Sequence, residues 1–202
     1  MPPSEAAAAV LCLASVSPRR SELLRQIGVP HLAAAPNIDE RVLPGEPAAD
    51  YVRRMARAKA DAVRAHTLAL PVLAADTIVV LEEEICGKPG SEEEGVAMLA
   101  RLSGRTHRVL TAVALAASGA PALRLSVSEV HMRAISAAEA RAYWHTGEPH
   151  DKAGGYAVQG RGAVFIEHLA GSYSGVMGLP LFETAQLLRA AGIPCWLGQA
   201  HP

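Results

Sequence analysis

The sequence predicts an α/β protein, because segments typical of buried strands alternate with segments typical of helices along the whole chain. Short continuous apolar runs bounded by turn residues indicate the strands. Ser–x–x–Glu patterns in front of apolar stretches indicate capped helix starts. Half of the 202 residues are hydrophobic, which is enough for one substantial core. No internal repeat or long linker interrupts the chain, so we expect a single domain over residues 10–192, with tails at 1–9 and 193–202.

The first predicted elements are a strand and two helices. Residues 10–14 form an apolar run typical of a buried strand. A helix is expected to begin at Ser17-Pro18, since serine is a good N-cap and proline fits the first helical turn, and to end at Gly28. Prolines 44 and 47 open a longer helix that ends near His66.

A second apolar run covers residues 72–81 and is broken by one charge, Asp76, so we interpret it as a strand with one special residue. The acidic turn at 82–84 leads into a short strand at 85–87. A capping box of Ser91 with Glu94 then begins a helix that ends at residues 103–104.

The second half of the chain continues the alternation. Residues 109–117 and 125–133 are expected to be adjacent strands around a turn at 118–121. Ser136 with Glu139 forms another capping box, and its helix ends near Gly147. A glycine-rich loop covers 154–162, a strand 163–167, and the last helix 180–191.

The bulk composition narrows the classes of function. With 19 basic and 20 acidic residues, the net charge is -1, whereas nucleic-acid-binding proteins usually show a basic excess. The three cysteines form no CxxC pair, which argues against a disulfide framework or a structural zinc site. No apolar run approaches the length of a membrane span, and the run at 6–14 has no basic segment before it. We therefore expect a cytoplasmic protein that binds neither nucleic acid nor membrane.

Asp76 is the least expected residue for folding alone, because an ionised carboxylate among apolar neighbours is costly unless it is paired or binds a cation. It is either a functional acid or a buried carboxylate that caps the backbone or pairs with an arginine. Lys59 lies on the apolar stripe of its predicted helix, seven residues after Val52 and four before Val63. It either points into a site or extends to the rim with its stem buried.

Arg19 and Arg20 lie in the first turn of a predicted helix, where acidic residues are usually preferred. Together with the hydroxyls of Ser15 and Ser17 and the free backbone N–H groups, they suit a phosphate, although two solvated arginines explain the pattern as well. Lys88 on its own is an ordinary loop lysine. The glycines at 154–162 permit either close approach to a ligand or tight turns, and Gln159 within them is either a base-reading amide or a surface residue.

Six segments of the chain resemble the Maf family of nucleotide pyrophosphatases, in the order and at the spacing of that family. The most distinctive are LASVSPRRSELLRQIG, VLAADTIVV, GKP and TGEPHDKAGGYAVQGRGAVFIEHLAGSYSGVMGLPLFET. The resemblance implies an elongated mixed sheet with flanking helices and two lobes around a nucleotide cleft, similar to the inosine triphosphate pyrophosphatases. It also implies hydrolysis of a nucleoside triphosphate to a monophosphate and pyrophosphate, with Mg²⁺ or Mn²⁺, and a homodimer.

The family's functional positions carry over residue by residue. Asp76 would be the proton acceptor, and Glu40 would assist with metal or water. The triphosphate would be held by Ser17, Arg20, Lys59 and Lys88. Three positions, Arg19, Thr77 and Gln159, resemble the branch of the family that cleaves dTTP and UTP.

Two other functions stay open at this point. One is cleavage of 7-methyl-GTP or a damaged purine triphosphate, although Arg19, Thr77 and Gln159 count against it. The other is a non-catalytic regulator that binds nucleotide and controls septum formation, since Maf-like proteins are also associated with that process.

Overall fold

The computed structural model describes residues 8–66, 70–117 and 121–196, and within them it contains a seven-stranded mixed sheet. The strand order is β2-β1-β3-β5-β6-β7, and β4 pairs with β3 outside this path. β1 is parallel to β2 and to β3, whereas β3, β5, β6 and β7 pair in antiparallel fashion. The strands are β1 (Leu11–Ala14), β2 (His31–Ala34), β3 (Val72–Leu81), β4 (Glu84–Cys86), β5 (Thr106–Ala116), β6 (Ala122–Met132) and β7 (Ile166–Ala170).

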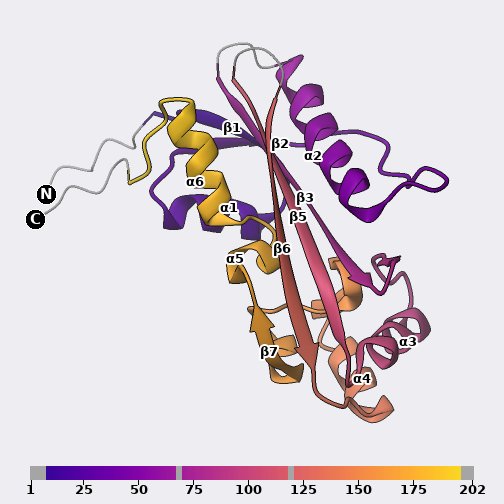
Figure 1. Ribbon diagram of the computed structural model, residues 1–202. Helices are drawn as coiled ribbons and strands as arrows, with labels where there is room; N and C mark the ends of the chain where they lie inside the picture. The colour runs from indigo at the N-terminus through magenta and orange to yellow at the C-terminus, as the bar shows by residue number, and fades with distance from the viewer. Residues whose placement is uncertain (1–7, 67–69, 118–120, 197–202) are drawn as a thin grey trace, which may run out of the picture.

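The long strands β3, β5 and β6 run through the whole length of the molecule and give it an elongated shape (Figure 1). At one end, α2 covers one face of the sheet, and α1 and α6 cover the other. At the opposite end, α3 and α4 pack together. The helices are α1 (Pro18–Gln26), α2 (Ala48–Arg64), α3 (Glu92–Leu102), α4 (Ala137–Trp144), α5 (Tyr173–Met177) and α6 (Leu181–Ala190).

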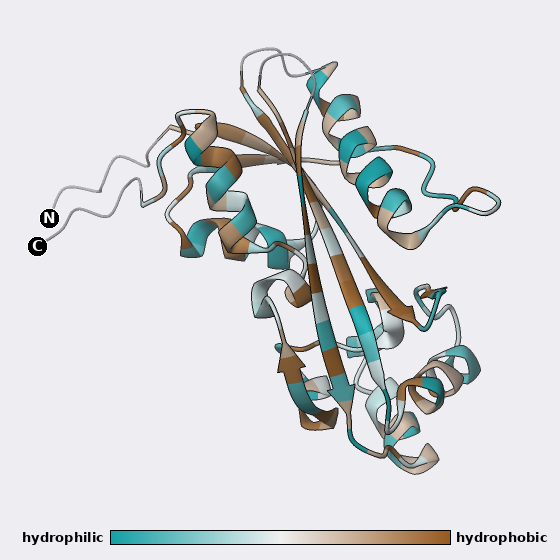
Figure 2. Ribbon diagram, in the orientation of Figure 1, coloured by the Kyte–Doolittle hydropathy of each residue, from teal (hydrophilic) through white to brown (hydrophobic). Residues whose placement is uncertain are grey.

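Three clusters of buried apolar side chains hold these layers together. Val52, Met55 and Val63 pack α2 against the sheet, and the helices α1 and α6 contribute leucines to a second cluster on the other face. Figure 2 shows the matching hydropathy pattern, with hydrophobic stretches in the central strands and hydrophilic bands on α2. The third cluster joins α3 and α4 to the far ends of β3 and β5. The predicted α/β class, with a mixed sheet flanked by helices, is confirmed.

Local predictions differ from the structure where the pattern was weak. The edge strand β2 and the short helix α5 were not predicted, because β2 is only half-buried and α5 has one buried residue. The strand predicted at 163–167 is wrong in its start: residues 161–165 form a 3-10 helix, and the strand covers 166–170. Of the predicted tails at 1–9 and 193–202 and the predicted turn at 118–121, residues 1–7, 197–202 and 118–120 lie outside the described residues.

The three predicted helix N-caps differ in the hydrogen bonds that they make in the structure. The capping box of Ser136 and Glu139 is complete. Ser91 accepts from the Glu94 N–H, but the Glu94 carboxylate accepts from Gly90 N instead of closing the box. Ser17 occupies the N-cap position of α1, yet its hydroxyl makes no capping bond. Among the described residues, no helix is both long and apolar enough to cross a membrane.

Candidate active site

A cleft of about 770 Å³ is lined by residues from α1, α2, β3 and the glycine-rich loop. Its lining comes from segments that are far apart in the sequence. All nine residues singled out from the sequence line it, namely Ser17, Arg19, Arg20, Glu40, Lys59, Asp76, Thr77, Lys88 and Gln159. The fold therefore brings together every predicted site residue.

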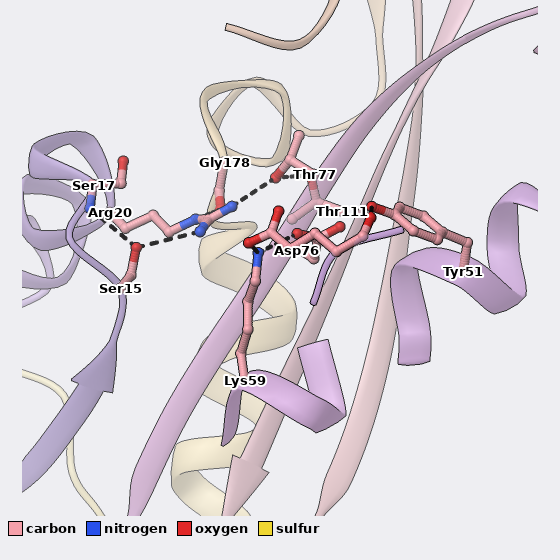
Figure 3. A network of polar contacts seen from close by, with 10 residues as sticks. Ser15, Ser17, Arg20, Tyr51, Lys59, Asp76, Thr77, Thr111 and Gly178 are labelled. Carbon is pink, nitrogen blue, oxygen red and sulfur yellow. Dashed lines mark hydrogen bonds and ion pairs between the residues drawn. The ribbon is translucent and has the colours of Figure 1, made fainter. Parts of the chain in front are cut away.

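A buried ion pair lies at the centre of the cleft (Figure 3). Lys59 Nζ is 2.7 Å from Asp76 Oδ1 and 2.9 Å from Glu40 Oε1. The side chains of Lys59 and Asp76 are each only 8% exposed, so water screens their interaction little. Of the two interpretations of Lys59, the structure selects the one in which its side chain points into the site.

The packing of α2 explains the position of Lys59. Val52, Met55, Ala56 and Val63 form the buried stripe that faces the sheet, and Lys59 lies within this stripe. Its stem is therefore directed toward β3, where Asp76 is the one charged residue. Glu40 comes from the loop before α2, and its carbonyl oxygen accepts a hydrogen bond of 2.8 Å from the Tyr51 hydroxyl.

Tyr51 is a cleft residue that the sequence did not single out, because it reads as part of the apolar face of α2. Burial and the nearby Asp76 and Glu40 carboxylates raise the pKa of Tyr51 to about 12. Its hydroxyl therefore stays protonated at neutral pH and fixes the backbone at Glu40. Lys152 also lines the cleft and was not singled out, although it lies two residues before the glycine-rich loop.

Arg20 is held by three acceptors from different segments. Its Nε donates to the Gly178 carbonyl at 2.8 Å, and its two terminal nitrogens donate to Ser15 Oγ and Thr77 Oγ1, each at 3.3 Å. Figure 3 shows the guanidinium reaching from α1 toward β3 and the segment after α5. Burial lowers the pKa of Arg20, with Asp76 acting in the opposite direction. Arg20 is therefore a fixed cation beside the acid.

A chain of hydroxyl groups continues behind Arg20. Thr111 Oγ1 lies 2.7 Å from the Gly175 carbonyl and 3.0 Å from Thr77 Oγ1. Thr111 has one hydroxyl hydrogen and a carbonyl can only accept, so Thr111 donates to Gly175 and accepts from Thr77. The Thr77 hydroxyl is thereby left with its lone pairs toward Arg20. Thr111 was not singled out from the sequence, where it is an ordinary strand residue.

The other predicted residues lie around this centre. Ser17 is half-buried, and its backbone N–H donates to Ser15 Oγ at 3.1 Å. Arg19 Nη1 is 3.6 Å from Asp151 Oδ2, so the first turn of α1 contacts the segment before the glycine-rich loop. Lys88 and Gln159 are exposed side chains on the cleft wall.

The donor set suits a small hard cation that is shared with a substrate. Glu40 and Asp76 place two carboxylates around one cationic position, which Lys59 Nζ occupies in the structure. Among residues 8–66, 70–117 and 121–196, no group of three or more His, Cys, Asp or Glu side chains could hold a metal ion. Mg²⁺ is usually held by one or two carboxylates together with substrate phosphates, so the residues fit this ion better than a metal held by protein ligands alone.

The cleft contains a buried acid and several cations. Because fixed cations stabilise charge on phosphate oxygens, this arrangement defines a class of protein: an α/β enzyme that acts on phosphate-containing substrates. Residues 10–191 match the family described as Maf-like protein. The chain belongs to the Maf-like family.

Several relatives align with this chain over most of its length. It is 54% identical over 190 residues to a dTTP/UTP pyrophosphatase of Saccharophagus degradans, covering 92% of this chain and 90% of the relative. It is 54% identical over 192 residues to a dTTP/UTP pyrophosphatase of Bordetella avium, covering 91% and 96%. A protein of the same description from Alkalilimnicola ehrlichii is 56% identical over 182 residues, covering 87% and 90%.

Proposed function

We propose that this protein hydrolyses dTTP and UTP, or closely related pyrimidine triphosphates, to the nucleoside monophosphate and pyrophosphate. The carrying observation is the buried Asp76 carboxylate, paired with Lys59 in a cleft that also presents Arg19, Arg20 and Lys88. Three relatives named dTTP/UTP pyrophosphatase, each more than half identical to this chain, support the same activity.

In the proposed reaction, a water oxygen attacks the α phosphorus and the bond to the bridging oxygen of the β phosphate breaks. Asp76 accepts the proton of the attacking water. Lys59 contacts Asp76 Oδ1, which leaves Oδ2 as the oxygen for this proton. Pyrophosphate leaves with the bonding electrons, and the proton on Asp76 then passes to solvent.

The cations have two roles in this proposal. Lys59 orients Asp76, and Arg20, Lys88 and the hydroxyl of Ser17 hold the phosphate oxygens. Mg²⁺ or Mn²⁺ would be held by Glu40 together with the substrate phosphates, and it would supply charge neutralisation on the phosphate oxygens. Several positive charges around one acid are expected, because positioning and electrostatics dominate phosphoryl transfer.

We assign base preference to the wall of the cleft that carries Gln159. The amide of Gln159 carries both a donor and an acceptor and can therefore read a pyrimidine edge. Arg19 and Thr77 are the other two positions shared with the dTTP- and UTP-cleaving branch. In the structure, the Thr77 hydroxyl contacts Arg20 and Thr111, so its contribution would pass through the position of Arg20.

We further propose that residues 10–192 act as one catalytic domain in the cytoplasm, as a homodimer without a nucleic-acid partner. The near-neutral charge of the chain supports the absence of a polyanionic partner. The homodimer rests on the family resemblance.

The proposal is tested with purified protein, Mg²⁺ and a panel of dTTP, UTP, CTP, 7-methyl-GTP, ITP and ATP. Pyrophosphate is quantified separately from orthophosphate. We expect pyrophosphate from dTTP and UTP, and a fall in kcat of at least about a hundredfold in Asp76→Asn. Cleavage of 7-methyl-GTP instead would refute the assigned specificity. Nucleotide binding without any turnover would favour a regulatory role.

A further inference from the structure

The glycine-rich loop that carries Gln159 is held on both sides of this residue by two side chains. On one side, the Ala157 N–H donates to the Tyr143 hydroxyl at 3.1 Å. On the other side, the N–H groups of Arg161 and Gly162 donate to the two carboxylate oxygens of Glu148, each at 3.0 Å. The backbone is therefore fixed two residues before and two residues after Gln159.

These two side chains are also bonded to each other. The Tyr143 hydroxyl donates to Glu148 Oε1 at 2.6 Å, so one connected group of hydrogen bonds reaches both sides of the loop. Tyr143 lies on α4 and is only 4% exposed. Burial and the Glu148 carboxylate raise the pKa of Tyr143, which keeps the phenol protonated as a donor. Burial acts to raise the pKa of Glu148, but its bonds to Tyr143, Gly162 and Arg161 outweigh this and hold that pKa below the usual value.

Two glycines of the loop, Gly160 and Gly162, are explained by the same pair. A Cβ atom on Gly160 would lie 2.1 Å from Glu148 Oε2, and one on Gly162 would lie 2.6 Å from the Tyr143 hydroxyl. Both positions therefore exclude a side chain so that the loop backbone can approach Tyr143 and Glu148. Sequence alone left open whether these glycines serve a ligand or a turn, whereas the structure shows them facing the two supporting side chains.

Neither supporting side chain lines the cleft, whereas Ala157, Val158 and Gln159 do. We infer that Tyr143 and Glu148 are positioning residues for base recognition, which fix the loop so that Gln159 presents its amide to the base of the bound triphosphate. This inference rests on the proposed function, because it takes Gln159 as the base-reading residue. If the loop were mobile, the donor and the acceptor of the Gln159 amide would adopt many orientations, and the preference for one base over another would decrease.

The predicted signature is a loss of base preference without a loss of phosphate affinity. Arg20, which is assigned to the phosphate, and Lys59, which orients Asp76, lie on α1 and α2, and their contacts in the structure involve neither Tyr143 nor Glu148. UTP and CTP differ at the pyrimidine edge but carry the same triphosphate. The ratio of their kcat/KM values therefore reports on base reading, and inhibition by inorganic triphosphate reports on the phosphate site.

The experiment compares Tyr143→Phe and Glu148→Gln with the wild type and with the control Tyr173→Phe, whose ring is half-exposed outside the cleft. In both loop variants we expect the UTP-to-CTP ratio to fall about fivefold, the equivalent of one hydrogen bond. The inhibition constant of inorganic triphosphate should stay within about twofold of wild type, because no phosphate contact is removed. The control should match the wild type in both measurements.

An unchanged ratio in folded Tyr143→Phe would overturn the inference, as would an equal loss of triphosphate binding. Equal cleavage of UTP and CTP by the wild type would also overturn it. Amide hydrogen exchange on the wild type gives a readout that needs no variant to fold: rapid exchange at residues 157, 161 and 162 would contradict the bonds on which the inference depends. A wild type that releases no pyrophosphate from any triphosphate would instead refute the proposed function.

Discussion

Replacing Thr111 by valine tests whether the hydroxyl chain behind Arg20 contributes to substrate binding. Valine has the shape of threonine but lacks the hydroxyl. In the structure, Thr111 is 1% exposed, bonds to the Gly175 carbonyl at 2.7 Å and lies 3.0 Å from Thr77 Oγ1. The variant leaves the Thr77 hydroxyl without its acceptor, so this hydroxyl can turn away from the orientation in which it accepts from Arg20.

The expected loss of stability in Thr111→Val depends on which hydrogen bonds remain in the variant. The Gly175 carbonyl still accepts from the Gly178 N–H at 3.0 Å, so it is not left without a donor. We therefore expect the net loss of one hydrogen bond, about 1 kcal/mol in the free energy of unfolding. For a chain of this length, that corresponds to a decrease in Tm of about 2–4 °C. If the contact between Arg20 and the substrate phosphate weakens by the same free energy, the KM for UTP should rise about fivefold.

Thr111→Ser is the matched control, because it keeps the hydroxyl and removes the methyl group. It should lose about 1 kcal/mol of stability through the small cavity, yet keep the KM of the wild type. Urea unfolding gives the stabilities, and pyrophosphate release from UTP gives the kinetics. A wild-type KM in Thr111→Val, or an equal rise in KM in Thr111→Ser, would refute the role of the hydroxyl chain.

Three further predictions concern the ion pair, the base-reading amide and a buried histidine. Lys59→Met should lower kcat at least about a hundredfold, because it removes a buried positive charge beside the acid; turnover near that of the wild type would exclude Lys59 from the reaction. Gln159→Glu should weaken the preference for pyrimidines in the triphosphate panel, and an unchanged profile would remove Gln159 from base recognition. Burial lowers the pKa of His107 to about 4, so the unfolded chain binds a proton below about pH 6.5 that the folded protein excludes. The free energy of unfolding should therefore decrease by up to about 3 kcal/mol as the pH falls from 6.5 to 4. Urea unfolding of His107→Phe should lack this part of the pH dependence. An identical pH dependence in the variant would contradict the assignment of this loss of stability to His107.

The sequence alone identifies the residues that depart from the hydrophobic pattern around them. Asp76 is the one charge in a mostly apolar strand, and Lys59 falls on the apolar stripe of a helix. A buried charge is costly, so each departure from the hydrophobic period indicates a compensating partner or ligand. The α/β class follows from the same periodicity. The edge strand β2 and the helix α5 escaped prediction, because their few buried residues give no period to recognise.

The partners of those residues were decided only by the tertiary structure. Lys59 meets Asp76 because α2 packs its buried stripe on the sheet, and Glu40 joins them from a loop whose backbone Tyr51 holds. A sequence pattern records which side of its own element a residue occupies, but the order of strands in the sheet decides which elements face each other. Gly160 and Gly162 show the same division: their spacing is visible in the sequence, whereas the reason for them, close approach to Glu148 and Tyr143, exists only once the loop lies against these two side chains.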